Sequence, residues 1–448
     1  MKQSVIIAIV IVVIVIIAGA AAFATLSSTK TTTSSIQSTT SSTSTTSSSP
    51  TISSSITTLS SSISTLSSSV STSNSSAPIN IGIEEDLTTS LAAFNQEAIA
   101  MAQVAANQIN AQGGVSGHKI VLYTADELPD PVAAAQKLIL QDHVMAIIGI
   151  SYSGDAVAIM PTLAKYHTIG IWCTDSLNSL MSNVTSDYND YKYFFRLYAQ
   201  DSSYSATLQS FFSNVTKPTS IYIVGEDLVF ARESAAAVNA TAQSLGIKVL
   251  GSTFVPLSQT DFSTLATQIG SLHPSAVVDL QVTSGAATFI NQLRANPAAS
   301  NIQLIYIGNG ALDDPYVMGQ VESSNPGSLN GMIFTTFPGT NSTPYNSLTT
   351  ALAKAYENMT HSNYYSLPSY TYSAVQILAR AVANTSSLDP NVLVPALEKT
   401  NYDGPTGLIT FDSSHNLVFP GYWLLQVQSG KIQIVWPAKY ATASYQAP

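Results

Sequence analysis

Short apolar runs alternate with stretches of helical periodicity from Pro78 onward. Ile79–Ile83 is an apolar run of strand length, and Ala92–Ala111 repeats apolar residues at helical spacing until Gly113 and Gly114 end the pattern. Strands that alternate with helical crossovers form a parallel sheet covered by helices on both faces. The pattern continues with expected strands at Lys119–Tyr123, Val144–Ile150 and Thr168–Trp172, and with expected helices at Pro131–Gln141 and Ala156–Tyr166.

The same alternation restarts after a loop near residue 200. Two consecutive units of similar size predict two α/β lobes, and 448 residues are enough for two domains. The second unit contains expected strands at Ser220–Val224, Lys248–Val255, Ala276–Gln281 and Leu304–Ile307, and expected helices at Arg232–Leu245, Phe262–Ser271 and Ala286–Asn296.

The N-terminus differs from the rest of the chain. Val5–Phe23 is an uninterrupted apolar run, preceded by Lys2, and it is long enough for a bilayer core. The positive charge favours a cytoplasmic N-terminus, so the remainder lies outside the cytoplasmic membrane. We interpret residues 1–24 as a transmembrane anchor, with a signal peptide cleaved near Gly19–Ala22 as the alternative. Either way, the chain is expected at the cell surface.

Residues 25–78 are almost entirely Ser and Thr. Such a segment buries too little apolar surface to offset the entropy of ordering, so it is predicted to be a solvated stalk, of a composition that is commonly O-glycosylated. Five aliphatic residues in it follow a heptad-like spacing, but two heptads without charged flanks favour incidental aliphatics over a coiled coil. Because the chain is expected to be exported, its Asn-x-Ser/Thr motifs are candidate sites of N-glycosylation. These seven sites are Asn74, Asn183, Asn214, Asn239, Asn341, Asn358 and Asn384.

Composition and motifs argue against several classes of protein. Only 9% of residues are charged and no basic run exists, so a nucleic-acid partner is not expected. Cys173 is the only cysteine, and the six histidines have no ligand-like spacing, so neither a metal site nor a cofactor is predicted. Residues 149–153 approach the GxSxG pattern without its last glycine, and residues 308–313 approach GxGxxG without its third. The sequence therefore does not predict an enzyme.

Two neighbouring strand ends carry candidate binding residues. Val144–Ile150 runs into a loop with Tyr152 and Ser153, and Thr168–Trp172 runs into a loop with Asp175 and Ser176. Ligands bind beyond the carboxyl ends of parallel strands, and the free N–H groups of a helix N-terminus together with a hydroxyl hold an anion such as a carboxylate. The alternative is that these residues only cap helices and form turns.

Three segments carry a family resemblance: Ala105–Ile120, with Ile109-Asn110 and Gly113-Gly114 inside it; Asp130–Ile139; and Gly404–Gly407 followed by Phe411-Asp412. Their order and spacing resemble the type I periplasmic binding proteins, specifically the leucine/isoleucine/valine-binding branch that serves ABC transporters. The resemblance covers roughly residues 79–437.

This resemblance implies two Rossmann-like lobes with parallel sheets, joined by three crossing strands and closing on a ligand by hinge motion. Lobe one is expected at 79–199 plus 338–419, lobe two at 200–337 plus 420–437, and a tail at 438–448. The implied function is capture of a small polar ligand for an ABC transporter permease. A ligand-sensing ectodomain with a separate transducer is the main alternative; an enzyme on the same scaffold and a structural surface protein rank below it.

The resemblance also implies roles for individual residues. Ser153 falls on the carboxylate-binding serine, and Asp175 and Ser176 fall on a second loop that takes the carboxylate and the ammonium of an amino acid. Phe94 and Phe230 fall on closing aromatics where tyrosine is common. Asn309 falls where the family has an acid that pairs with the ammonium group. An amide holds a cation less well than a carboxylate, so amino acids, small amides and organic acids all stay open as ligands.

Overall fold

The computed structural model describes residues 77–89, 91–307, 315–339, 344–361, 364 and 366–447, without the side chains of 315–317. The predicted anchor 1–24, nearly all of the predicted stalk 25–78 and the candidate residue Asn309 lie outside these residues. In the part of the chain that is described, no helix combines the length and apolarity that a membrane crossing requires. All described residues belong to one unit, 72–448.

The first sheet has five strands in the order β2-β1-β3-β4-β5, and every neighbouring pair is parallel. Alternate residues of a strand face opposite sides of the sheet: Ile148 packs in the same apolar cluster as Met101 of α2, whereas Ile147 packs with Leu138 of α3. The elements of this part are β1 (Ile79–Glu85), α2 (Ala92–Ala111), β2 (Ile120–Asp126), α3 (Pro131–Leu140), β3 (Ala146–Gly149), α4 (Ser153–Tyr166), β4 (Ile169–Trp172), α5 (Ser182–Ser186), α6 (Tyr188–Tyr191) and β5 (Phe194–Arg196).

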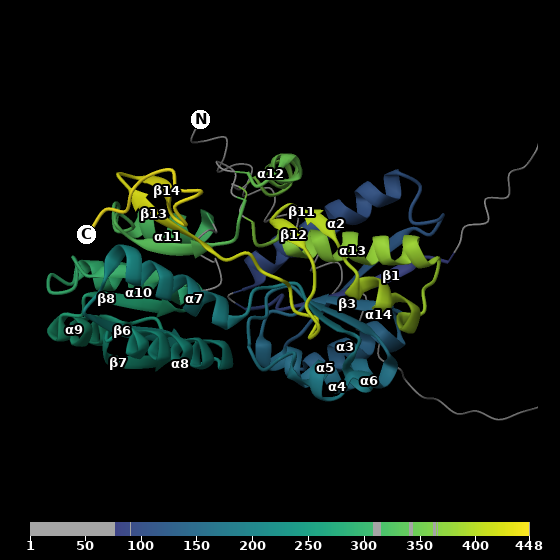
Figure 1. The fold of residues 1–448 in the computed structure, drawn as a ribbon, viewed down its shortest axis with the longest axis horizontal. Helices are drawn as coiled ribbons and strands as arrows, with labels where there is room; N and C mark the ends of the chain where they lie inside the picture. The colour runs from purple at the N-terminus through teal and green to yellow at the C-terminus, as the bar shows by residue number, and fades with distance from the viewer. Residues whose placement is uncertain are drawn as a thin grey trace, which may run out of the picture. The chain divides into compact units, whose positions relative to one another are not determined.

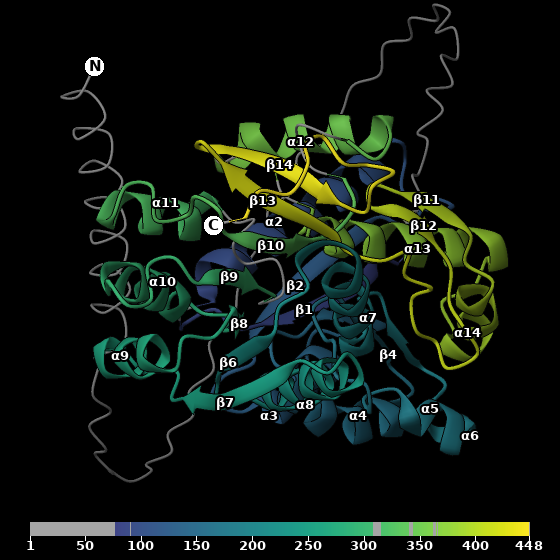
Figure 2. The ribbon, with the colours of Figure 1, turned by 60° about the vertical axis from the view of Figure 1, so that its left-hand side comes forward.

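The second sheet has seven strands in the order β14-β13-β10-β9-β8-β6-β7. Its strands from β10 to β7 run parallel, and β13 joins the edge antiparallel to both β10 and β14, as Figure 2 shows. The elements are α7 (Asp201–Phe211), η1 (Phe212–Thr216), β6 (Ser220–Glu226), α8 (Val229–Ser244), β7 (Lys248–Val255), α9 (Ser263–Leu272), β8 (Ala276–Leu280), α10 (Gly285–Ala295), β9 (Gln303–Tyr306), α11 (Pro315–Ser324), β10 (Ile333–Thr336), β13 (Trp423–Gln428) and β14 (Lys431–Trp436).

The chain returns to the first sheet between β10 and β13. The elements of this return are α12 (Ser347–Thr360), α13 (Ser369–Thr385), α14 (Pro390–Glu398), β11 (Tyr402–Gly404) and β12 (Gly407–Ile409). Helix α13 packs along α2, and α12 also contacts α2 (Figure 1). The described chain therefore passes between the two sheets three times: after β5, after β10 and before β13.

The α/β architecture with parallel sheets that the hydrophobic pattern predicts is confirmed. Helix α2 has the expected bounds, but β1 and α4 differ from expectation. Strand β1 continues past Ile83 through Glu84 and Glu85, whose side chains are buried although they are acidic. Helix α4 begins at Ser153, three residues before the first apolar residue of its periodic pattern, so the candidate Ser153 lies at a helix N-terminus.

Candidate functional site

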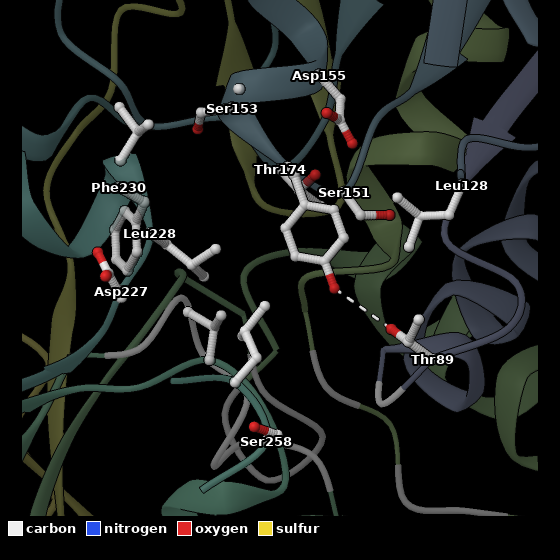
Figure 3. A pocket seen from close by; sticks show the side chains of 15 residues that line it. Thr89, Leu128, Ser151, Ser153, Asp155, Thr174, Asp227, Leu228, Phe230 and Ser258 are labelled. Atoms are coloured by element: carbon white, nitrogen blue, oxygen red, sulfur yellow. Dashed lines mark hydrogen bonds between the residues drawn. The ribbon is translucent and has the colours of Figure 1, made fainter. Parts of the chain in front are cut away.

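A pocket of about 620 Å³ lies where the carboxyl ends of strands from both sheets face each other (Figure 3). This volume suits a small organic ligand. The described residues that line it are Thr89, Leu128, Ser151, Tyr152, Ser153, Gly154, Asp155, Thr174, Asp227, Leu228, Val229, Phe230, Leu257, Ser258 and Val282.

The sheet topology accounts for the position of this pocket. In the first sheet β1 lies between β2 and β3, and in the second sheet β6 lies between β7 and β8, so the direction of winding reverses at β1 and at β6. Loops that leave a parallel sheet at such a reversal separate to opposite faces and open a crevice at the carboxyl ends. Every lining residue follows the end of one of seven parallel strands: β1, β2, β3 and β4 of the first sheet, and β6, β7 and β8 of the second.

The N-terminus of α4 supplies donors to the pocket. Tyr152, the residue before the helix, has an extended backbone, and the N–H groups of Ser153 and Gly154 have no acceptor among the described residues. Ser153 is 8% exposed and lines the same space. Unpaired N–H groups at a helix N-terminus, with a neighbouring hydroxyl, can bind a carboxylate.

Gly149 makes the tight approach of β3 to β1 possible at this end of the sheet. Its φ is +112°, and a Cβ at this position would lie 2.6 Å from Oε1 of Glu85 and 2.7 Å from the carbonyl oxygen of Glu84. Only glycine tolerates both the backbone conformation and the contact. The glycine therefore allows the loop at Ser151 to pack directly on the end of β1.

Ser151 is the centre of a hydrogen-bond network beneath the pocket. Its hydroxyl donates to Oε2 of Glu85 at 2.8 Å and accepts the main-chain N–H of Asp86 and the side-chain amide of Asn95, each at 2.8 Å. Its own N–H donates to Oε2 of Glu127 at 3.1 Å. The loop that begins α4 is thus held in place by carboxyl groups at the ends of β1 and β2.

Three buried carboxyl groups, those of Glu84, Glu85 and Glu127, are shifted toward the protonated form. Burial, reinforced by the neighbouring Asp155 and Glu85, raises the pKa of Glu84 to about 9. Burial raises the pKa of Glu85 to about 8 against the opposing hydrogen bond from Ser151, and burial together with the charge of Glu85 raises the pKa of Glu127 to about 10. Both side-chain oxygens of Glu84 and one oxygen each of Glu85 and Glu127 are buried without a hydrogen-bond partner among the described residues. We call Glu84, Glu85 and Glu127 the floor carboxyls.

Arg196 places a positive charge beside two buried acids, Asp175 and Asp201. Its guanidinium is fully buried, donates through Nε to Asn416 at 3.0 Å, and interacts with the charges of Asp175 and Asp201. Burial raises the pKa of Asp175 to about 7, while the nearby Ser153 hydroxyl and Arg196 oppose that rise. Arg196 therefore compensates acids behind the pocket and does not line the pocket itself.

Only some of the residues that the sequence predicted for the site line the pocket. Tyr152, Ser153 and Phe230 line the pocket, and the Tyr152 hydroxyl donates to Oδ2 of Asp86 at 3.0 Å. Asp175 and Ser176 are buried behind the pocket, next to Ser153 and Asp201 respectively. Phe94 is half-buried in α2 and packs against the apolar core. Asn309 lies outside the described residues.

Most of the pocket wall was not predicted from the sequence. Thr174, next to the predicted Asp175, lines the pocket in its place. The others share one signal, which is that they follow the ends of predicted strands at the reversal points. These residues are Thr89, Leu128, Ser151, Gly154, Asp155, Asp227, Leu228, Val229, Leu257, Ser258 and Val282.

The match to a family model decides the family: residues 78–431 match the model of the periplasmic binding protein family. The chain belongs to this family. Among curated relatives, a Leu/Ile/Val-binding protein of Rhizobium johnstonii is 24% identical over 361 residues, which are 80% of this chain and 93% of the relative. A leucine-specific-binding protein of Salmonella typhimurium is 24% identical over 321 residues, 70% of this chain and 82% of the relative.

Solved structures of the family share the fold. The branched-chain amino acid transporter substrate binding protein LivJ of Streptococcus pneumoniae, in complex with isoleucine, superposes with a TM-score of 0.70 at 19% identity, over 79% of this chain and 97% of that one. An ABC transporter solute binding protein of R. palustris, in complex with 4-hydroxybenzoate, superposes with a TM-score of 0.69 at 16% identity, over 83% of this chain and 98% of that one. At these identities the likeness concerns the fold alone.

Proposed function

We propose that this periplasmic binding protein is the solute-binding component of an ABC importer. It captures a small amino acid-like, carboxylate or amide ligand, without changing it chemically, in the pocket between the two sheets. The observation that carries the proposal is the set of unpaired donors at the start of α4, which face a pocket of ligand size. The names of the relatives, which bind leucine, isoleucine, valine or an aromatic acid, support the same ligand classes.

In this proposal the ligand's carboxylate docks on the N–H groups of Ser153 and Gly154 and on the Ser153 hydroxyl. Phe230 and Leu228, from the other side of the pocket, then cover the ligand. The walls that they and Ser153 form belong to different sheets, and the chain passes between these sheets three times. Rotation about these three connections opens and closes the pocket, and the closed form is the one that the permease recognises.

The membrane attachment belongs to the same proposal. Residues 1–24 would hold the protein at the cytoplasmic membrane, and residues 25–78 would let the binding part reach the permease. A tether of this kind raises the local concentration of the captured ligand without adding any contact. Extraction of membranes at alkaline pH is the direct check, since an integral anchor keeps the protein in the pellet and a cleaved signal releases it.

N-glycosylation is also a proposal. Asn183, Asn214, Asn358 and Asn384 are exposed, so a glycan at any of them would not displace the core. Mass spectrometry of peptides from the native protein checks each position.

The binding proposal is tested by isothermal titration calorimetry and thermal melting of the full-length chain with a panel of amino acids, amides and organic acids. A ligand present at a hundredfold its Kd adds about 2.7 kcal/mol to the free energy of unfolding, which is a measurable rise in Tm. If no compound in the three classes raises the Tm or releases heat, the proposed ligand classes are wrong.

A further inference from the structure

The charged residues around the pocket restrict the class of ligand further than the protein family alone does. None of the described residues that line it is Lys, Arg or His. The undescribed positions between residues 77 and 447 contain no Lys, Arg or His in the sequence either. A ligand in this pocket therefore meets no cationic side chain from any of these residues.

Negative charge, in contrast, reaches the pocket from two sides. Asp155 and Asp227 both line it. Asp227 is already compensated, because its Oδ1 lies 2.6 Å from Nη2 of Arg232 in an exposed ion pair. Asp155 forms no ion pair with any of the described residues.

Asp155 is the third residue of α4 and is half-buried. Its carboxylate accepts no hydrogen bond from the described residues, and in Figure 3 it points into the same space as Ser151, on the side away from Phe230. Burial raises the pKa of Asp155, and the charge of the neighbouring Asp86 adds to that rise. A cation beside Asp155 would relieve this repulsion, whereas a second anion would add to it.

We propose that Asp155 holds an ammonium group of the ligand, so that the pocket selects amino acids or amines with an apolar body and discriminates against carboxylates that have no ammonium group. This inference rests on the proposed function and narrows its ligand class. The carboxylate of an amino acid docks at the start of α4 and its ammonium lies on Asp155. Its apolar side chain packs against Phe230, Leu228 and Val282.

A matched series of ligands tests the inference on the unmodified, full-length protein. Leucine is compared with 4-methylpentanoate, which lacks only the ammonium group, and phenylalanine is compared with 3-phenylpropanoate. In at least one pair the amino acid is expected to bind at least about tenfold more tightly at neutral pH, a difference of about 1.4 kcal/mol. Equal or tighter binding of the acids overturns the inference and leaves the proposed function intact.

Two variants test whether Asp155 causes the preference. Asp155→Asn is expected to remove most of the tenfold difference in affinity, because it weakens binding of the amino acid and leaves binding of the carboxylate without an ammonium group unchanged. Asp227→Asn also removes a carboxylate from the pocket, but Arg232 already neutralises that carboxylate. This variant is therefore expected to lose clearly less of the preference for the amino acid. A preference that survives in Asp155→Asn, or is lost equally in both variants, contradicts the inference.

The alternative role of Asp155 is to offset the dipole of α4, as acids in the first turn of a helix do. In that case Asp155→Asn would lower the Tm of the ligand-free protein and would weaken the binding of all ligands by the same factor. If no amine or amino acid binds while an amide or an organic acid does, the inference fails and the proposed function stands. If nothing in any class binds, the proposed function itself fails.

Discussion

The floor carboxyls make the stability of this protein depend on pH, and Glu127 allows the clearest test. Its side chain is fully buried and only one of its oxygens takes a hydrogen bond, from the N–H of Ser151. We consider the change Glu127→Gln, which keeps the shape and the acceptor but cannot ionise. The effect is measured as the free energy of unfolding at several pH values.

The sign follows from the pKa of Glu127, which burial and Glu85 raise from 4.5 to about 10 in the folded protein. The folded state therefore binds a proton that the unfolded state releases. The stabilisation is complete below about pH 4.5 and is lost as the pH rises toward 10. One such group lowers the free energy of unfolding by about 1.4 kcal/mol per pH unit, or by about 2 to 3 kcal/mol between pH 5 and pH 7.

Chemical denaturation of the wild type and of Glu127→Gln, at pH 5, 6 and 7, measures this loss. At pH 5 the two proteins are expected to differ by less than about 1 kcal/mol, because a protonated carboxyl and an amide have similar hydrogen-bonding capacity. At pH 7 the variant is expected to be more stable by about 2 to 3 kcal/mol. Asp190→Asn, which changes an exposed acid of α6, is the control and should keep the pH dependence of the wild type.

A variant that is less stable than the wild type by the same amount at every pH would refute this reasoning. Such a result would mean that Glu127 is ionised in the folded protein and that its charge is compensated by a contact not described above.

Three further experiments test the geometry around the pocket, the first with a matched control. Gly149→Ala is expected to cost more than about 2 kcal/mol in the free energy of unfolding, whereas Gly154→Ala, where a Cβ would meet no atom within 4 Å, is expected to be neutral or stabilising. Arg196→Met removes the cation that interacts with Asp175 and Asp201 and is expected to lower the free energy of unfolding by about 3 to 5 kcal/mol. A loss below about 1 kcal/mol would mean that both acids are protonated in its absence. Ser153→Ala is expected to weaken ligand binding about tenfold while the Tm of the ligand-free protein stays nearly constant; the opposite pattern would make Ser153 a purely structural residue.

The fold was predictable because its signal is repeated along the chain. The alternation of apolar strands and periodic helices is visible in each unit, and Ala92–Ala111 has the same bounds in the sequence pattern and in the structure. The burial of Glu84 and Glu85 was not predictable in this way. Hydrophobic periodicity treats an acidic pair as the end of a strand, and only the packing of Gly149 and Ser151 against β1 reveals that these side chains are enclosed.

The candidate site was predictable in part. Ser153 lies at the start of a helix after a buried strand, and both features are local in the sequence. The positions of Thr174 and Asp175 were not, because these neighbours point to opposite sides of one loop, and which of them faces the ligand depends on the backbone of that loop. Nothing local in the sequence shows that the carboxylate of Asp155, in the first turn of α4, accepts no hydrogen bond from the described residues.

The most direct test is a variant that fills the pocket. A side chain placed at Gly154 meets no atom at its Cβ, so Gly154→Leu occupies the space in front of α4 without disturbing the fold. For any compound that binds the wild type in calorimetry, the account predicts that Gly154→Leu shows no measurable heat of binding, while its Tm without ligand stays within about 1 °C of the wild type, a change of less than about 1 kcal/mol. Unchanged affinity in this variant would show that the ligand binds elsewhere on the protein.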